Sequence, residues 1–373
     1  MLRKTSYYKT YIRRKNMLAG ARIIKTGIAI TLSMLICNYF DIQPAIFAGA
    51  ATVLNMQPSL GLSFHNAWEQ ILVHFVSISI AIILGLTLGN NPFIMGLTSV
   101  LVILICQHFR WRGSLAGGVM ASIFILSSPS AQFIDHALIR SLAIFVGVSV
   151  ALIVNFTIAP PRYRQPLQKK LLELNSLVTK YFDDAVQSFL SLDIPSPALM
   201  EEQKNNVEQL FREVQKLYKL YYLDIGAHTF DPNSEQEKIS KYYEEYLAYN
   251  KGLWQRTRDI LFLSQERRER RQQAGDRPIS SEFQEILDLL SEAQTHFLSQ
   301  NEELKNKLEG QNIQHVEEPH IWRKLDKILN NWHNQFPSGS YSLHALIEIS
   351  LITYKIRWAA KEAMQLLDND LIL

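Results

Sequence analysis

Residues Pro44–Gly61 read PAIFAGAATVLNMQPSLG, and this stretch decides how the rest of the chain is interpreted. Thirteen residues from Pro44 to Met56 carry no charge, whereas a helix that crosses a bilayer needs about 20 apolar residues. Short segments interrupted by proline or glycine are typical of transport sites, because irregular backbone persists at membrane depth only beside protein or a water-filled cavity. A shallow helix packed against its neighbours explains the same stretch, and both interpretations stay open.

Charge divides the 373 residues into two unlike halves. Residues 1–161 hold 11 Lys/Arg and 3 Asp/Glu, whereas residues 162–373 hold 27 Lys/Arg and 32 Asp/Glu. The charged side chains between Thr26 and Ile139 are Asp41, Glu69, Arg110, Arg112 and Asp135. Such sparse charge predicts a membrane domain. The acidic balance of the second half argues against a nucleic-acid partner.

Six apolar segments are expected to cross the bilayer. They are 20–40, 44–56, 71–89, 93–107, 113–126 and 138–159. Six crossings place both termini on one side, and that side collects the basic N-terminus, Arg110 and Arg112, and the cations that follow Pro161. By the positive-inside rule both termini are cytoplasmic, which predicts a multi-pass protein of the cell membrane.

The second half changes to charged amphipathic helices. Apolar residues at steps of three and four predict helices over about 166–191, around 207–221, and over about 234–273, 283–304, 321–336 and 341–367. No segment alternates with period two, so no sheet is expected. The chain is therefore predicted to be all-α: a basic cytoplasmic N-terminus (1–19), a six-helix transmembrane domain (20–161) and a cytoplasmic α-helical domain (162–373).

The chain lacks the common motifs of enzymes and metalloproteins. It has no Gly-rich phosphate loop, no H-E-x-x-H motif and no paired cysteine ligands. His315 and His320, with Glu317 and Glu318, are possible metal ligands, but a polar loop between helices is the ordinary explanation. Cys37 and Cys106 lie in apolar segments and are interpreted as small hydrophobic residues. We expect no cofactor, no metal and no enzymatic activity.

Four stretches carry a family resemblance. They are GARIIKT at Gly20–Thr26, QPSLG at Gln57–Gly61, the run Arg140–Gly147, and the run from Asn155 to Tyr163. Together they resemble the bacterial aromatic acid exporter family, which is related to fusaric acid resistance proteins. The resemblance covers the membrane half, and the helical tail fits the half-length, six-helix branch of that family.

The resemblance implies export of small aromatic organic acids. Double-length members of the family further imply that two copies of this unit assemble, so a homodimer is expected in the bilayer. The sequence departs from the family pattern after the second segment, where members often carry basic residues and this chain has Leu62 and Gln70. Cations at these two positions would favour an anionic substrate, and this chain lacks them there.

Two basic residues are candidate partners for a substrate carboxylate. Lys25 lies about one turn inside the first segment, where its alternative role is to reach the lipid headgroups. Arg140 is the sole cation expected on the outer face, where it could instead be an interfacial anchor paired with Asp135.

Three polar residues complete the candidate site. Asn55 and Gln57 could bind a substrate carboxylate or satisfy the broken backbone of the second segment, and the sequence does not separate these roles. His74 lies in an apolar run and is a candidate proton relay, although a hydrogen-bonded structural histidine is the more ordinary explanation.

The function expected from these observations is a transporter that exports small aromatic organic acids, driven by the proton gradient. Two other classes remain open. One is a membrane anchor without transport activity whose cytoplasmic helical bundle binds a partner. The other is a sensor in which ligand binding in the membrane reshapes that bundle.

Overall fold

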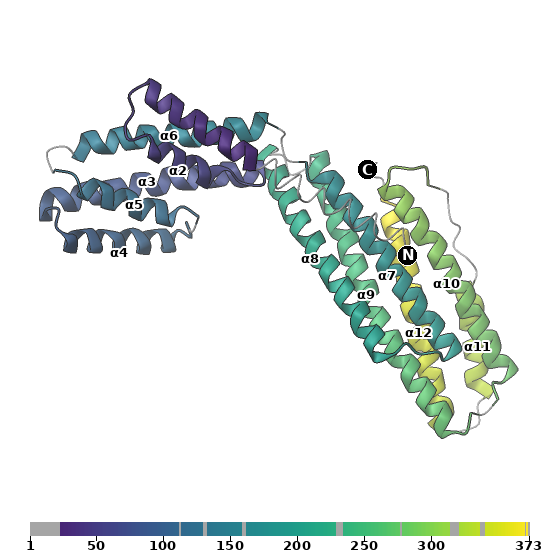
Figure 1. The fold of residues 1–373 in the computed structure, drawn as a ribbon. Coiled ribbons are helices and arrows are strands. Elements are labelled where there is room, and N and C mark those ends of the chain that lie inside the picture. Colours follow the sequence, from purple (N-terminus) through teal and green to yellow (C-terminus); the bar gives the residue numbers. More distant parts are fainter. Residues whose placement is uncertain are drawn as a thin grey trace. The chain divides into compact units, whose positions relative to one another are not determined.

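The computed structural model describes residues 23–111, 113–129, 133–158, 162–228, 234–276, 278–313, 321–335, 340–369 and 371. Its elements are Ile23–Tyr39, α2 (Ile46–Asn55), α3 (Leu60–Leu88), α4 (Pro92–His108), α5 (Leu115–Leu126), α6 (Phe133–Thr157), α7 (Arg164–Ser191), α8 (Pro197–His228), α9 (Glu235–Gln273), α10 (Ser281–Leu308), α11 (Ile321–Gln335) and α12 (Ser340–Leu367). No strand occurs in this described part, which confirms the all-α class (Figure 1).

The chain divides into two compact units. One comprises Met1–Arg162 and Leu220–Phe230, and the other comprises Tyr163–Lys219 and Asp231–Leu373. The last turns of α8 therefore belong with the first unit. The division into 1–19, 20–161 and 162–373 stays a prediction, and the basic stretch 1–19 lies outside the described residues.

Small residues bring α2 against α6 in the first unit. Ala143, Gly147 and Ala151 recur every fourth residue and form a buried stripe of small residues on α6. A Cβ added at Gly147 would overlap the backbone carbonyl of Ala48, so only glycine permits this approach. The hydroxyl of Thr52 bridges the same contact and donates to the carbonyl of Gly147 at 3.1 Å.

Two helices begin earlier than hydropathy indicates. α3 starts at Leu60 rather than Ile71, and α6 starts at Phe133 rather than Leu138. The start of α3 is fixed by its cap: Ser59 accepts from the backbone N–H of Leu62 at 3.1 Å. The N–H of Leu60 is satisfied by Asp224 Oδ1 at 3.1 Å. The first turns of these helices contain polar residues. An apolar run therefore begins later in the sequence than the helix itself.

Two described helices, α3 and α6, are long and apolar enough to cross a bilayer by length and composition alone. The other apolar helices of the first unit are shorter, with 10–17 described residues each. The segments predicted at 44–56, 93–107 and 113–126 are present as helices with closely matching ends. Their crossing of the bilayer stays a prediction.

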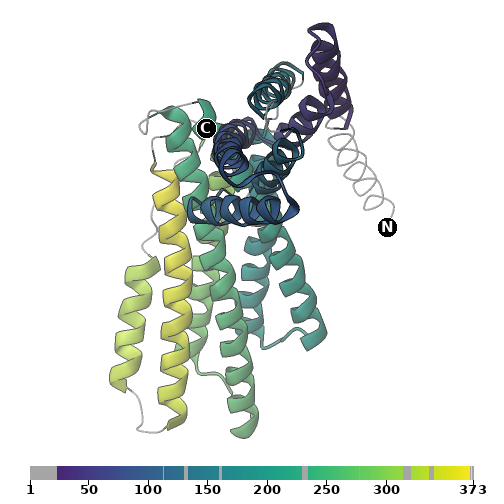
Figure 2. The same cartoon turned by 90° about the vertical axis from the view of Figure 1, so that its left-hand side faces the viewer.

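The second unit is built from long helices that pack side by side. α7 contacts α9 and α10, and α12 contacts α9 and α10 (Figures 1 and 2). The predicted apolar face of α7 is buried: Leu167, Leu171 and Leu174 are at most 1% exposed. A buried amide layer crosses this core, where Asn175 donates to Asn250 Oδ1 at 3.0 Å and to Asn301 Oδ1 at 3.2 Å. The predicted helical array is thus present in this unit.

Candidate functional site

Asn155, near the end of α6, is the centre of a buried polar cluster. Its Nδ2 donates to the carbonyl of Gln57 at 3.1 Å and to Ser63 Oγ at 2.8 Å. Its Oδ1 lies 3.4 Å from Lys25 Nζ. Lys25 is only 7% exposed, so its ammonium group faces protein. The structure therefore brings two of the predicted residues, Lys25 and Gln57, together around Asn155.

The side chains of Asn55 and Gln57 satisfy the end of α2. Asn55 Nδ2 donates to the carbonyl of Ala51 at 2.8 Å and to Gln70 Oε1. Gln57 Nε2 donates to the carbonyl of Leu54 at 2.7 Å. These bonds favour the structural role of both residues in this conformation. Asn55 Oδ1 is nevertheless buried and accepts no hydrogen bond.

Arg140 lies between two aromatic rings from different helices. Its Cζ is 5.2 Å from the ring centroid of Phe47 on α2 and 5.3 Å from that of Phe124 on α5. The two rings meet edge to face, with centroids 5.2 Å apart. Arg140 makes no ion pair with Asp135 among the described residues. The anchor role that would need this pair is therefore not seen.

The guanidinium of Arg140 has unused hydrogen-bond donors. Its Nε and Nη1 are both buried, and neither has an acceptor. Buried donors in proteins are nearly always paired, because an unpaired donor costs about 1–3 kcal/mol. This combination of a cation, aromatic neighbours and vacant donors suits a ligand with an anionic head and a flat apolar body.

His74 on α3 is hydrogen-bonded beside Arg140. Its Nε2 lies 3.1 Å from Ser141 Oγ, and Ser141 donates its hydroxyl proton to the carbonyl of Ala137 at 2.7 Å. Since that proton is used, His74 Nε2 is assigned as the donor to Ser141. The arrangement is that of a buried structural histidine, and a role as proton relay stays a prediction.

The predicted site residues fall into two groups. Arg140 and Asn155 are both on α6, 15 residues apart, which corresponds to about 22 Å along the helix axis. Lys25 and Gln57 surround Asn155 at one end, while His74 and Arg140 lie near the other. One small ligand cannot contact both groups at once.

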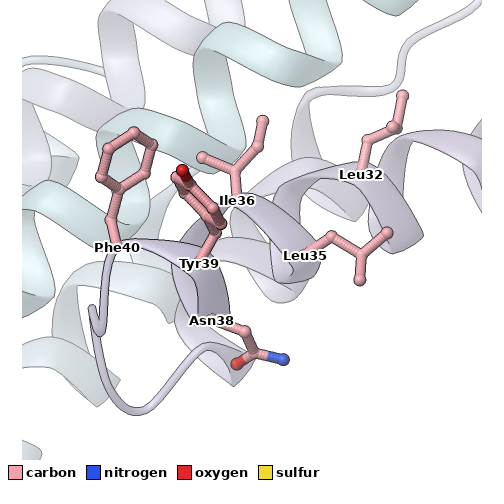
Figure 3. Close-up of a pocket in the computed structure, with 6 residues that line it drawn as sticks. All are labelled: Leu32, Leu35, Ile36, Asn38, Tyr39 and Phe40. Carbon is pink, nitrogen blue, oxygen red and sulfur yellow. The ribbon is translucent and has the colours of Figure 1, made fainter.

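The hollow shown in Figure 3 is not part of either group. It has a volume of about 550 Å³, and six side chains line it: Leu32, Leu35, Ile36, Asn38, Tyr39 and Phe40. All six come from the helix Ile23–Tyr39 and the residue after it, and only Asn38 offers an amide. The hollow is an apolar surface feature without candidate substrate-binding residues.

Several contributing residues were missed by sequence reasoning. Asn155 could have been found, because it ends the small-residue stripe of α6 and interrupts an apolar run. Phe47 and Phe124 gave no signal, since an aromatic residue in an apolar segment is ordinary and only packing of α2, α5 and α6 brings them together.

The described residues contain no group of three or more His, Cys, Asp or Glu that could hold a metal ion. His315 and His320 lie outside the described residues. Cys37 and Cys106 are both free and buried, as expected for small hydrophobic side chains.

Comparison with known proteins supports the resemblance of the first half. Residues 17–158 match the family described as "Aromatic acid exporter family member 1". The chain is 31% identical over 207 residues to UPF0421 protein YgaE of Bacillus subtilis (strain 168), an alignment that covers 56% of each protein. It is 24% identical over 235 residues to UPF0421 protein SAUSA300_1870 of Staphylococcus aureus (strain USA300), covering 63% of this chain and 64% of that relative.

The chain thus aligns with 56% to 64% of the length of these relatives. The family match covers α2 to α6, which carry Asn155 and Arg140 with their surroundings. Residues 17–158 of this chain are thus similar to the aromatic acid exporter family.

Proposed function

We propose that this protein is a membrane transporter that exports small aromatic organic acids and recognises their carboxylate at Arg140. The family match of residues 17–158 supports a transporter. The observation that carries the substrate proposal is the guanidinium of Arg140, which has two buried donors without acceptors between Phe47 and Phe124.

The chemistry of this group fits an aromatic carboxylate. A guanidinium presents paired N–H donors that match the two oxygens of a carboxylate. Aromatic rings pack well against another ring in edge-to-face or offset geometry. An ionisable residue within an apolar membrane helix is costly, so its presence favours a functional role. α6 has this character, because it is one of the two long apolar helices.

Binding of benzoate to the purified full-length protein tests the substrate proposal. We expect calorimetry to detect benzoate, and to find weaker binding of cyclohexanecarboxylate, which has the same charge without the aromatic ring. Arg140→Gln should abolish binding, and Arg140→Lys should weaken it because an ammonium cannot match both oxygens. Arg162→Gln removes an exposed cation at the edge of the unit and is the matched control.

Two results would contradict the proposal. One is benzoate affinity that survives in Arg140→Gln. The other is an equal loss of benzoate affinity in Arg162→Gln, because the loss in Arg140→Gln would then result from the change in net charge. Unchanged affinity in Arg140→Lys would contradict bidentate recognition.

We further propose that the first unit spans the cell membrane several times with both termini in the cytoplasm, and that transport is driven by the proton gradient. His74 is the candidate relay for the proton. If His74→Ala keeps full proton-driven flux in proteoliposomes, His74 is no relay. His74→Gln, which retains a donor for Ser141, separates loss of titration from loss of the hydrogen bond.

A homodimer is proposed as the functional assembly, because the first unit alone has few helices with which to enclose a pathway. Many apolar side chains of this unit face outward, among them Phe75, Phe93, Leu138 and Phe145. Lipid or a second copy can cover such a surface. Native mass spectrometry from detergent should show twice the mass of one chain, and a monomer that retains flux would exclude the dimer.

A further inference from the structure

The side chain of Glu69 on α3 caps the N-terminus of α5. It is buried, with the residue 6% exposed. Its Oε1 accepts from the backbone N–H of Gly113 at 2.7 Å and from that of Ser114 at 3.1 Å. Ser114 occupies the N-cap position of α5, but its own side chain makes no capping bond. A carboxylate from another helix therefore supplies the cap of α5.

The strength of this cap depends on the charge of Glu69. Hydrogen bonds to an ionised carboxylate are about twice as strong as neutral ones. The partial positive charge at a helix N-terminus also favours an anion there. A proton added at Oε2 would leave Oε1 in place as an acceptor but would remove the charge. The neutral form of Glu69 consequently holds α5 less tightly than the ionised form.

α5 links Glu69 to Arg140. The helix has 12 residues, about 18 Å, and its first residue follows the Glu69 cap. Phe124 lies near its other end and is one of the two rings that cover the guanidinium of Arg140. A displacement of α5 would therefore change the cover over Arg140.

The vacant donors of Arg140 cannot be reached in this conformation. Nε and Nη1 are both buried. One of the two rings over the guanidinium must therefore move before an anion can bind these donors. Phe47 belongs to α2, whose backbone is in direct contact with α6 at Gly147. Phe124 belongs to the helix whose start is held by a titratable group. α5 is the covering element that a change of charge can release.

We propose that Glu69 is a proton-operated latch on α5. The ionised carboxylate holds α5 and keeps Phe124 over Arg140, and its protonation releases α5 so that an organic anion reaches the guanidinium. This inference rests on the proposed function and adds a residue that regulates the same site. Anion binding and proton uptake are then coupled, and each promotes the other.

The groups that face Glu69 come from three segments. On α3, His65 Nε2 lies 3.8 Å from Glu69 Oε2, and its protonation would favour the ionised carboxylate. On α4, Cys106 is within electrostatic range of Glu69. Just before α5, the facing groups are the backbone N–H groups of Gly113 and Ser114. Arg112 lies outside the described residues.

Hydrogen exchange of the full-length protein tests the latch without any substrate. The protection factors of amides 113–118 should fall by about tenfold in Glu69→Gln, which corresponds to exchanging a charged hydrogen bond for a neutral one. Wild-type protection there should decrease as the pH falls, whereas that of Glu69→Gln should stay constant. Asp41→Asn is the control: it removes the charge of an exposed carboxylate in the same unit, and it should leave the protection of amides 113–118 unchanged. Unchanged protection in Glu69→Gln would overturn the proposal.

Calorimetry in buffers of different ionisation enthalpy tests the coupling. We expect benzoate binding to wild type to take up protons, and the affinity to rise as the pH falls. Glu69→Gln should bind benzoate with no proton uptake and no such pH dependence, while Asp41→Asn, which neutralises an exposed carboxylate of the same unit, keeps both. Proton uptake that survives in Glu69→Gln would refute the latch. Absence of any benzoate binding to wild type would instead refute the proposed function, and hydrogen exchange would still decide whether Glu69 holds α5.

Discussion

Asn155 joins three segments of the first unit through one side chain. It contacts Lys25 in the first described helix, Gln57 after α2 and Ser63 in α3. A single amide can do this because it offers two donors and an acceptor. Arg140 is the opposite case on the same helix, since two of its donors have no partner. The contrast separates a polar residue whose side chain is fully hydrogen-bonded from one that has unused donors.

Replacing Asn155 with leucine should destabilise the first unit. The partly buried carbonyl of Gln57 would lose its donor, and an unsatisfied buried group costs up to about 1–3 kcal/mol. We expect a lower melting temperature of the protein in detergent. Asn38→Leu changes an exposed amide and should have little effect. Equal melting temperatures of the two variants would contradict the structural role of Asn155.

Helix ends, rather than helix existence, were hard to predict from the sequence. Apolar runs located α2, α4 and α5 to within a few residues, because charged or turn-forming residues flank them. The start of α3 was missed, since Ser63, His65 and Glu69 interrupt the apolar pattern over its first turns. These residues are helical because tertiary partners satisfy them: Ser63 binds Asn155, and Glu69 caps α5.

The contact of α2 with α6 should fail when Gly147 gains a side chain. Gly147→Ala places a Cβ on the carbonyl of Ala48. Because the clash is with backbone, the two helices must move apart to relieve it. We expect a melting temperature several degrees lower and weaker benzoate binding, since Phe47 moves with α2. Gly96→Ala on α4 is the control, because nothing lies within 4 Å of its added Cβ. This substitution should slightly stabilise the protein, because alanine favours a helix more than glycine does. Equal behaviour of the two variants would contradict this packing.

The buried tyrosines of α9 should resist ionisation in alkali. Burial raises the pKa of Tyr242, Tyr246 and Tyr249 in the second unit. Because the folded pKa is higher than the unfolded value of about 10, their contribution to stability is complete below pH 10 and is lost as the pH rises above it. Absorbance at 295 nm should therefore show their ionisation only together with unfolding, as followed by circular dichroism. Full tyrosine ionisation while the helices remain intact would contradict their burial.

For the molecule as a whole, composition predicted an apolar helical half and an amphipathic helical half, and both are present. The candidate site was predicted only in part. Lys25, Gln57, His74 and Arg140 stand out as polar groups in apolar sequence, so they could be named. Their division into two groups about 22 Å apart follows from the length of α6 and needed the structure. The rings around Arg140 depend on three helices meeting, which no local pattern encodes.

A counterflow assay tests the proposal of transport through a site at Arg140 most directly. Proteoliposomes loaded with unlabelled benzenesulfonate, an aromatic acid that stays ionised and does not leak as a neutral molecule, are diluted into the labelled compound. We expect transient accumulation of label with wild-type protein and none with Arg140→Gln. Equal accumulation with both proteins, or none with wild-type protein that binds the anion, would contradict transport through a site at Arg140.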